Sequence, residues 1–130
     1  MSGFSGYLED KVLEHVFGGN AFTAPSTLHV ALFTVAPTDT GGGTEVSGGS
    51  YARQTATFNV SGTNPTTATN AAAVEYPTAT ADYGTVVAVG IFDASSSGNL
   101  LAYASLTANK TVSSGDVFRF DAGDLDITLA

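Results

Sequence analysis

The feature that most constrains the fold is a change in hydrophobic period near residue 27. Residues 6–17 carry apolar side chains at helical spacing, whereas from Thr27 onward apolar residues recur at every second position in short segments. A period of two is typical of β-strands, because successive side chains point to opposite faces of a sheet. The sequence therefore predicts one N-terminal helix followed by strands.

The helix predicted over residues 6–17 has one apolar stripe. Its members recur at spacings of four and five residues: Leu8, Val12, Leu13, Val16 and Phe17. Ser5 is placed to cap the free amide groups at the start, and Gly18 follows the end. Such a stripe either packs on the domain's own core or docks on a neighbouring subunit, and the sequence leaves both interpretations open.

About eight short strands are predicted after the helix, separated by turns rich in Gly, Ser, Asn and Asp. They cover residues 27–33, 51–60, 69–76, 85–93, 100–106, 111–112, 117–121 and 125–129. The clearest is 85–93, a nearly unbroken β-branched run that suits the centre of a sheet covered on both faces. The Gly-rich residues 41–50 are predicted as a long exposed loop without a regular element, and residues 107–110 as a turn.

This pattern favours a mainly β fold: an antiparallel β-sandwich or jelly-roll-like domain of about eight strands with one short N-terminal α-helix. One open sheet with the helix across a face would leave the run at residues 84–93 half exposed. A chain of 130 residues is expected to form one compact domain. We expect an N-terminal docking helix within residues 1–20 and a single β-sandwich domain over residues 21–130.

Composition excludes several classes of partner and chemistry. The chain has 4 basic and 12 acidic residues and a net charge of −8, so it lacks the basic face that binds a phosphate backbone. It contains no cysteine, which rules out disulfides and thiolate chemistry. No run approaches the roughly 18 apolar residues of a membrane span, and the first residues do not resemble a secretory signal. We expect no nucleic-acid or membrane partner and synthesis in the cytoplasm.

No residue pattern for catalysis or metal binding stands out. His15 and His29 do not form a ligand pair, and no Gly-x-Ser-x-Gly motif is present. The glycines at residues 41–49 lack the Lys-Ser/Thr of a phosphate-binding loop. Three carboxylates, those of Asp121, Asp124 and Asp126, are loosely spaced like cation ligands but lack the closing glutamate of a calcium loop. We expect no enzyme activity, no cofactor and no metal.

Two features suit contacts between proteins or with sugars. Arg53, close to Tyr51, offers a planar fork for a carboxylate across a subunit contact, and an ion pair within the domain is the alternative. The chain has five tyrosines, which could form sugar-stacking surfaces or pack in a core or interface: Tyr7, Tyr51, Tyr76, Tyr83 and Tyr103.

The order of segments along the chain resembles a known family. The segments include Leu-His-Val-Ala-Leu-Phe-Thr at 28–34 and Gly-Thr-Val-Val-Ala-Val-Gly-Ile-Phe-Asp at 84–93. The others lie at residues 7–15, 36–39, 43–53, 76–83, 98–103, 106–110 and 114–116. Together they are similar to a family of small virion proteins of tailed bacteriophages, often labelled tail-fibre proteins. The resemblance implies no enzyme activity and a role in repetitive protein contacts.

The leading hypothesis is a non-enzymatic structural protein of the virion. It would form a homo-oligomer, with a trimer as the expected form, and would dock on capsid, neck or tail proteins, including as a head decoration (cement) or collar protein. The expected interface residues are Leu8, Val12, Val16, Glu45, Tyr51 and Arg53. The alternative is a receptor- or carbohydrate-binding module at a fibre tip. It would bind a host surface glycan through tyrosines and the loops near residues 41–50, 61–68 and 94–99.

Overall fold

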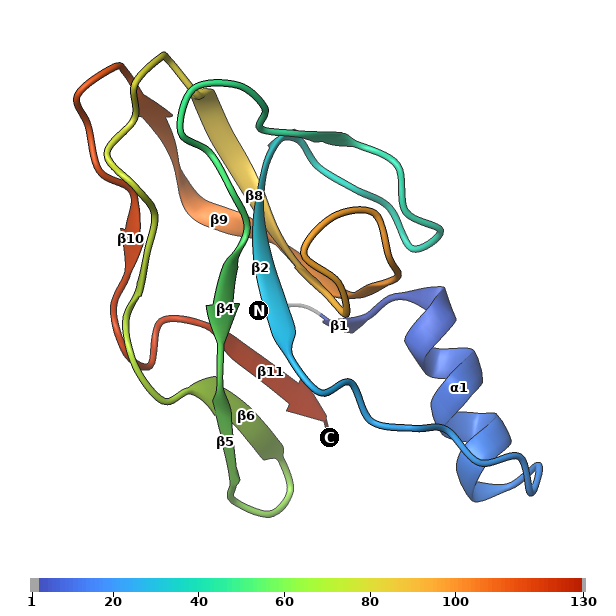
Figure 1. Cartoon of the computed structure of the whole chain (residues 1–130). Coiled ribbons are helices and arrows are strands. Elements are labelled where there is room, and N and C mark those ends of the chain that lie inside the picture. Colours follow the sequence, from blue (N-terminus) through green and yellow to red (C-terminus); the bar gives the residue numbers. More distant parts are fainter. Residues whose placement is uncertain (1–2, 130) are drawn as a thin grey trace.

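The computed structural model describes residues 3–129 and has the predicted mainly β architecture with one N-terminal helix (Figure 1). The helix, α1, spans Gly6–Val16. The strands are β1 (Gly3–Phe4), β2 (Leu28–Val35), β3 (Thr44–Glu45), β4 (Gln54–Ala56), β5 (Phe58–Ser61), β6 (Thr66–Asn70), β7 (Val74–Glu75), β8 (Gly84–Phe92), β9 (Leu100–Val112), β10 (Arg119–Phe120) and β11 (Asp126–Leu129). No helix among the described residues has the length and apolarity needed to cross a membrane.

The strands form three antiparallel sheets. The largest has the order β1-β9-β8-β2-β3, and β4 pairs with β2 beside β3. The others are the three-stranded sheet β11-β6-β5 and the two-stranded sheet β10-β7. The main core lies between the large sheet, which contributes Val30, Leu32 and Val86, and the two-stranded sheet, which contributes Val74 and Phe120; Phe58 of the three-stranded sheet packs against it. The β-branched run at 85–93 is confirmed as the strand β8, which lies between β2 and β9.

Two predicted local features are wrong. Residues 107–110 are not a turn but belong to β9, whose pairing with β8 shifts register between Ser105, opposite Ala88, and Lys110, opposite Val86. Residues 106–109 lie opposite the single residue Val87, so the strand bulges where the turn is predicted and then rejoins the ladder at Lys110. Residues 41–50 are not wholly irregular: Glu45 pairs with Phe33 in the short strand β3, and Val46 is buried.

Two predicted strands are each divided. The segment at 51–60 becomes β4 in the large sheet and β5 in the three-stranded sheet. The segment at 69–76 overlaps β6 and β7, which also belong to different sheets. Apolar and polar residues keep alternating where the chain passes from one sheet to another, so the alternation alone does not show where one strand ends and the next begins.

The helix starts at the predicted capping residue. The Ser5 hydroxyl accepts a hydrogen bond from the Leu8 amide at 3.3 Å and donates one to the carbonyl oxygen of Leu100. The Ser5 amide also donates to the Leu101 carbonyl oxygen at 2.7 Å, so the helix start is bonded to β9.

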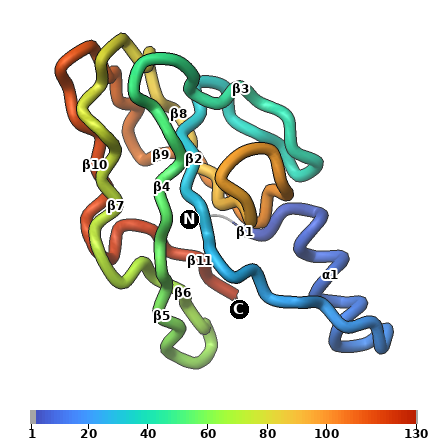
Figure 2. Tube along the Cα trace, viewed as in Figure 1, coloured from blue at the N-terminus to red at the C-terminus, as the bar shows by residue number. Residues whose placement is uncertain are grey.

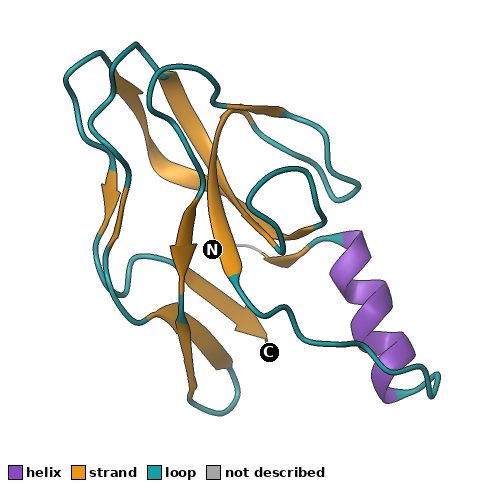
Figure 3. Ribbon diagram, viewed as in Figure 1, coloured by secondary structure: helices purple, strands orange, loops and turns teal. Residues whose placement is uncertain are grey.

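None of the α1 residues is buried, and the helix extends away from the sheets (Figure 3). Its apolar stripe is therefore not part of the domain's own core. The strand β1 before it pairs with β9 of the large sheet. The expected division into residues 1–20 and 21–130 stays a prediction, and its residues 1, 2 and 130 lie outside the described part of the chain.

Candidate functional site

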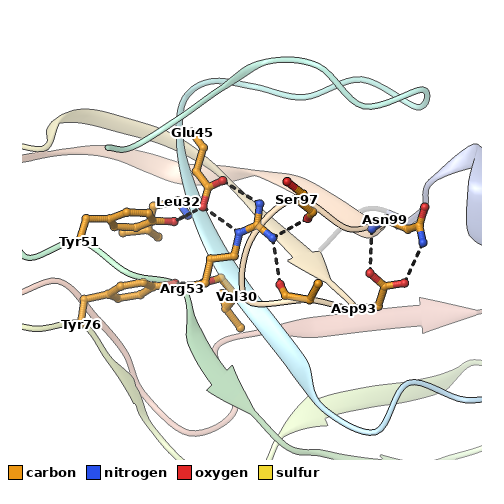
Figure 4. Close-up of polar contacts among 10 residues, drawn as sticks. Val30, Leu32, Glu45, Tyr51, Arg53, Tyr76, Asp93, Ser97 and Asn99 are labelled. Atoms are coloured by element: carbon orange, nitrogen blue, oxygen red, sulfur yellow. Dashed lines mark hydrogen bonds and ion pairs between the residues drawn. The ribbon is translucent and has the colours of Figure 1, made fainter. Parts of the chain in front are cut away.

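The structure brings three of the predicted interface residues together in one polar network (Figure 4). Glu45 from β3 receives two parallel hydrogen bonds from Arg53, Nε to Oε2 at 2.9 Å and an Nη to Oε1 at 2.8 Å. The Tyr51 hydroxyl donates to Glu45 Oε2 at 2.6 Å and accepts the Leu32 amide at 3.0 Å. The Arg53 guanidinium therefore binds a carboxylate of its own chain, which is the alternative that the sequence leaves open.

Arg53 also fixes the loop at residues 93–99. Its other Nη donates to the carbonyl oxygens of Ala94 and Ser97, both at 2.9 Å, and its guanidinium lies 3.8 Å from the centre of the Phe92 ring. Four of the five guanidinium N–H groups are thus used within the chain. The side chain is only 7% exposed. The intersubunit role expected for Glu45, Tyr51 and Arg53 stays a prediction, but little donor capacity remains for a partner.

Three of the five tyrosines extend this network into the core. The Tyr51 ring stacks on Tyr76 at 5.9 Å and meets Tyr83 edge-on at 5.7 Å. The Tyr76 hydroxyl donates to the Val30 carbonyl oxygen at 2.6 Å. Tyr76 and Tyr83 are buried, and burial raises the pKa of Tyr76 well above its ordinary value. These three rings are therefore packing groups and do not form an exposed platform for a sugar.

Because of Glu45, this network makes the free energy of unfolding depend on pH in the acidic range. Burial raises the pKa of Glu45, but hydrogen bonds from Arg53 and Tyr51 outweigh it and leave the pKa below its ordinary value. A carboxylate whose pKa is lower in the folded state stabilises the fold above its unfolded pKa, and this contribution is lost as the pH falls through the lowered value.

We therefore expect the free energy of unfolding, measured by urea titration, to fall as the pH decreases from about 5 to about 3. The variant Glu45→Gln has no charge to lose at this position, so its stability should fall less over the same range. Equal acid dependence in the two proteins would show that the Glu45 pair does not contribute.

The predicted interface residues of the helix have unequal exposure. Leu8 and Val12 are half-buried, whereas Val16 is 60% exposed. Two further members of the stripe, Leu13 and Phe17, are 58% and 81% exposed. Leu13, Val16 and Phe17 are spaced three and four residues apart and so lie on one side of the helix end. We call these three residues the apolar helix end.

The loops suggested for glycan binding do not form one surface. Residues 39–42 and 98–100 line a hollow of about 370 Å³ together with Ser5, Gly6 and Tyr7 at the start of α1. The loop between β5 and β6 lies apart from the start of α1, at the bottom of the molecule in Figure 2. Tyr7 lines the hollow, but Tyr51, Tyr76 and Tyr83 do not.

The three aspartates that resembled cation ligands have separate partners. Asp124 accepts the Asp121 amide at 2.9 Å within a turn, and Asp121 pairs with Arg119 at 2.8 Å. Asp126 accepts a hydrogen bond from the Thr69 hydroxyl at 3.1 Å. Within residues 3–129, no group of three or more His, Asp or Glu side chains is placed to hold a metal ion.

The sequence of this antiparallel domain places it in the class of phage fibre structural proteins. The model of one family, described as Podophage GP4 fiber I protein gp80, matches residues 3–128. The chain belongs to this family and is a structural component of a bacteriophage virion. The resemblance found in the sequence is thereby confirmed. A search of curated proteins gave no match.

Proposed function

We propose that this protein is a non-enzymatic, self-associating module of the virion that docks on the particle through the apolar helix end. The observation that carries the proposal is the exposure of Leu13, Val16 and Phe17 on a helix without a buried residue. Three large apolar side chains side by side on a projecting element mark a contact with another protein. Docking on tail, neck or capsid proteins fits this surface.

The family supports the structural role, and the fold supports the assignment of contacts. The body is stabilised by its own core and by the Arg53 network, so the helix is free to bind outside it. Glycan binding at a fibre tip has less support, because Tyr51, Tyr76 and Tyr83 pack together in or beside the core.

The double variant Val16→Asp/Phe17→Ser tests the docking surface. Because both side chains are exposed, we expect the free energy of unfolding to change by no more than about 0.5 kcal/mol per site. The number of copies per purified virion, measured by quantitative mass spectrometry, should fall at least roughly tenfold, the effect of losing about 1.4 kcal/mol of binding.

Val117→Asp is the matched control, since Val117 is 45% exposed and lies between β9 and β10, outside the helix. It should be incorporated like the original protein. Incorporation of the double variant at the original copy number would contradict the proposed docking surface.

A further inference from the structure

The three-stranded sheet β11-β6-β5 carries a second uncovered apolar surface, distinct from the helix. The register places Val60, Ala68 and Ile127 side by side across the three strands. Leu129 lies two residues after Ile127 in β11, opposite Thr66, and therefore on the same face of the sheet. Closer to the body this face belongs to the core, where Leu125 is buried and Phe58 packs against the main cluster. We call Val60, Ala68, Ile127 and Leu129 the overhang patch.

The overhang patch lies on the side of the sheet that faces the core, but beyond the limit of the core. Val60 is 71% exposed and Leu129 58% exposed, while Ala68 and Ile127 are half-buried. The hairpin of β5 and β6 forms one end of the molecule in Figure 1. Among residues 3–129, nothing covers Val60 from the other sheets.

The outer edge of β5 is also unpaired and unprotected. Within the described residues, β5 pairs only with β6. Proteins commonly protect outer strands with charged side chains, and β3, β7, β10 and β11 each have one: Glu45, Glu75, Arg119 and Asp126. β5 has none, and neither do the shorter outer strands β1 and β4; the whole run of residues 54–74, which includes β4, β5 and β6, lacks Asp, Glu, Lys, Arg and His.

The charge of the chain favours a second copy as the occupant of this edge. Two copies that each have a net charge of −8 repel one another, so a contact between them is least costly where no carboxylate lies. The β5 edge and the overhang patch meet that condition, and an identical uncharged strand is available on every other copy. Antiparallel pairing about a two-fold axis then satisfies both edges with main-chain hydrogen bonds.

We propose that β5 pairs with β5 of a second copy, which joins the two three-stranded sheets into one and brings the two overhang patches together at Val60. This inference rests on the proposed self-association and names the surface that produces it. An isologous pair of this kind closes on itself, so it builds dimers or assemblies with an even number of chains. It therefore departs from the trimer expected from the sequence.

Sedimentation equilibrium of three proteins tests the pairing: the original chain, Val60→Lys and the matched control Val117→Lys. A lysine at Val60 places two positive charges side by side in the paired sheet. We expect it to raise the dissociation constant of the dimer roughly tenfold or more, whereas Val117→Lys leaves it unchanged. Thermal unfolding of each variant checks that the fold is intact, which the 71% exposure of Val60 predicts.

Single cysteines provide a second measurement that does not depend on weakened binding. The chain has no cysteine of its own, so Asn59→Cys, Val60→Cys and Ser61→Cys each introduce one thiol. Facing residues of antiparallel strands are close enough for a disulfide. Mild oxidation should link two copies in at least one of these three variants and not in Val117→Cys.

The possible results separate this inference from the proposed function. Self-association that is equally strong in Val60→Lys, or a trimer insensitive to it, overturns the β5 pairing and leaves the helix docking intact. A chain that is monomeric at its highest soluble concentration overturns the pairing and the self-association together. If the chain is monomeric and the Val60→Lys variant is also missing from virions, another virion protein binds the β5 edge. That result too would overturn the pairing with a second copy.

Discussion

Replacing Arg53 with alanine is expected to lower the free energy of unfolding by about 3 kcal/mol, the lower end of the range for removing one partner of a buried ion pair, because the Glu45 side chain is 25% exposed. The change leaves the Glu45 carboxylate without its fork, because both parallel bonds to Arg53 are lost. It also leaves the carbonyl oxygens of Ala94 and Ser97 without the donor that fixes their loop. Urea denaturation followed by circular dichroism would measure the loss.

Two variants make this result specific. Arg53→Lys keeps the charge but not the planar fork, so it should recover only part of the lost stability. Arg119→Ala removes an arginine that is paired with Glu75 and Asp121 but is half exposed, and it should change stability little. If Arg53→Ala were no less stable than Arg119→Ala, the network around Arg53 would not hold the loops as described.

Replacing Tyr76 with alanine should have an effect of similar size, about 3–5 kcal/mol, because it empties a large volume in the core. Tyr76 is 1% exposed, stacks on Tyr51 and meets Phe118 edge-on. The smaller change Tyr76→Phe removes only the hydroxyl that donates to the Val30 carbonyl oxygen, and should cost about 1–2 kcal/mol. The same urea titration separates the contributions of the ring and the hydroxyl.

Tyr7→Phe is the matched control for the hydroxyl. Tyr7 is half-buried on the helix and its ring lies 5.6 Å from the Lys11 ammonium, a contact that phenylalanine retains. Its stability should remain within about 0.5 kcal/mol of the original. An equal loss in Tyr7→Phe and Tyr76→Phe would indicate that the bond to Val30 contributes nothing particular to the core.

The elements with strong local signals were predictable from sequence. The Ser5 cap and the apolar stripe predicted a helix at 6–17, and α1 spans Gly6–Val16. The β-branched run predicted β8 to within a residue at each end. In both cases the local preference and the final packing agree, so the pattern is sufficient.

Elements that depend on distant partners were not predictable in the same way. Residues 107–110 have the composition of a turn, and only the pairing of Lys110 with Val86 shows that β9 continues beyond a bulge at this point. β3 exists because Glu45 is held by Arg53 and by the ladder with β2. The Gly-rich sequence around Glu45 does not by itself reveal the contact with Arg53 or the pairing with β2.

The candidate site was predicted in its residues but not in its arrangement. Glu45, Tyr51 and Arg53 were identified together, and the structure joins them within one chain. The contribution of Phe92 and the loop carbonyls was missed, because backbone oxygens have no sequence signal. The exposure of Val60 was missed for a related reason: alternation assigns a residue to a face of a sheet but not to the part of that face that lies beyond the core.

The attachment of the helix has a mechanical consequence for a fibre. α1 is joined to the body through the two residues of β1 at its start and through residues 17–27, which lead to the first residue of β2 (Figure 1). β2 lies inside the large sheet, with β8 on one side and β3 and β4 on the other. Ladder bonds in antiparallel sheets are perpendicular to the strands, so tension that enters β2 along its axis loads these bonds in shear, all at once. A pull on the helix therefore loads a strand that is paired along both edges, while β1 alone could be peeled away bond by bond.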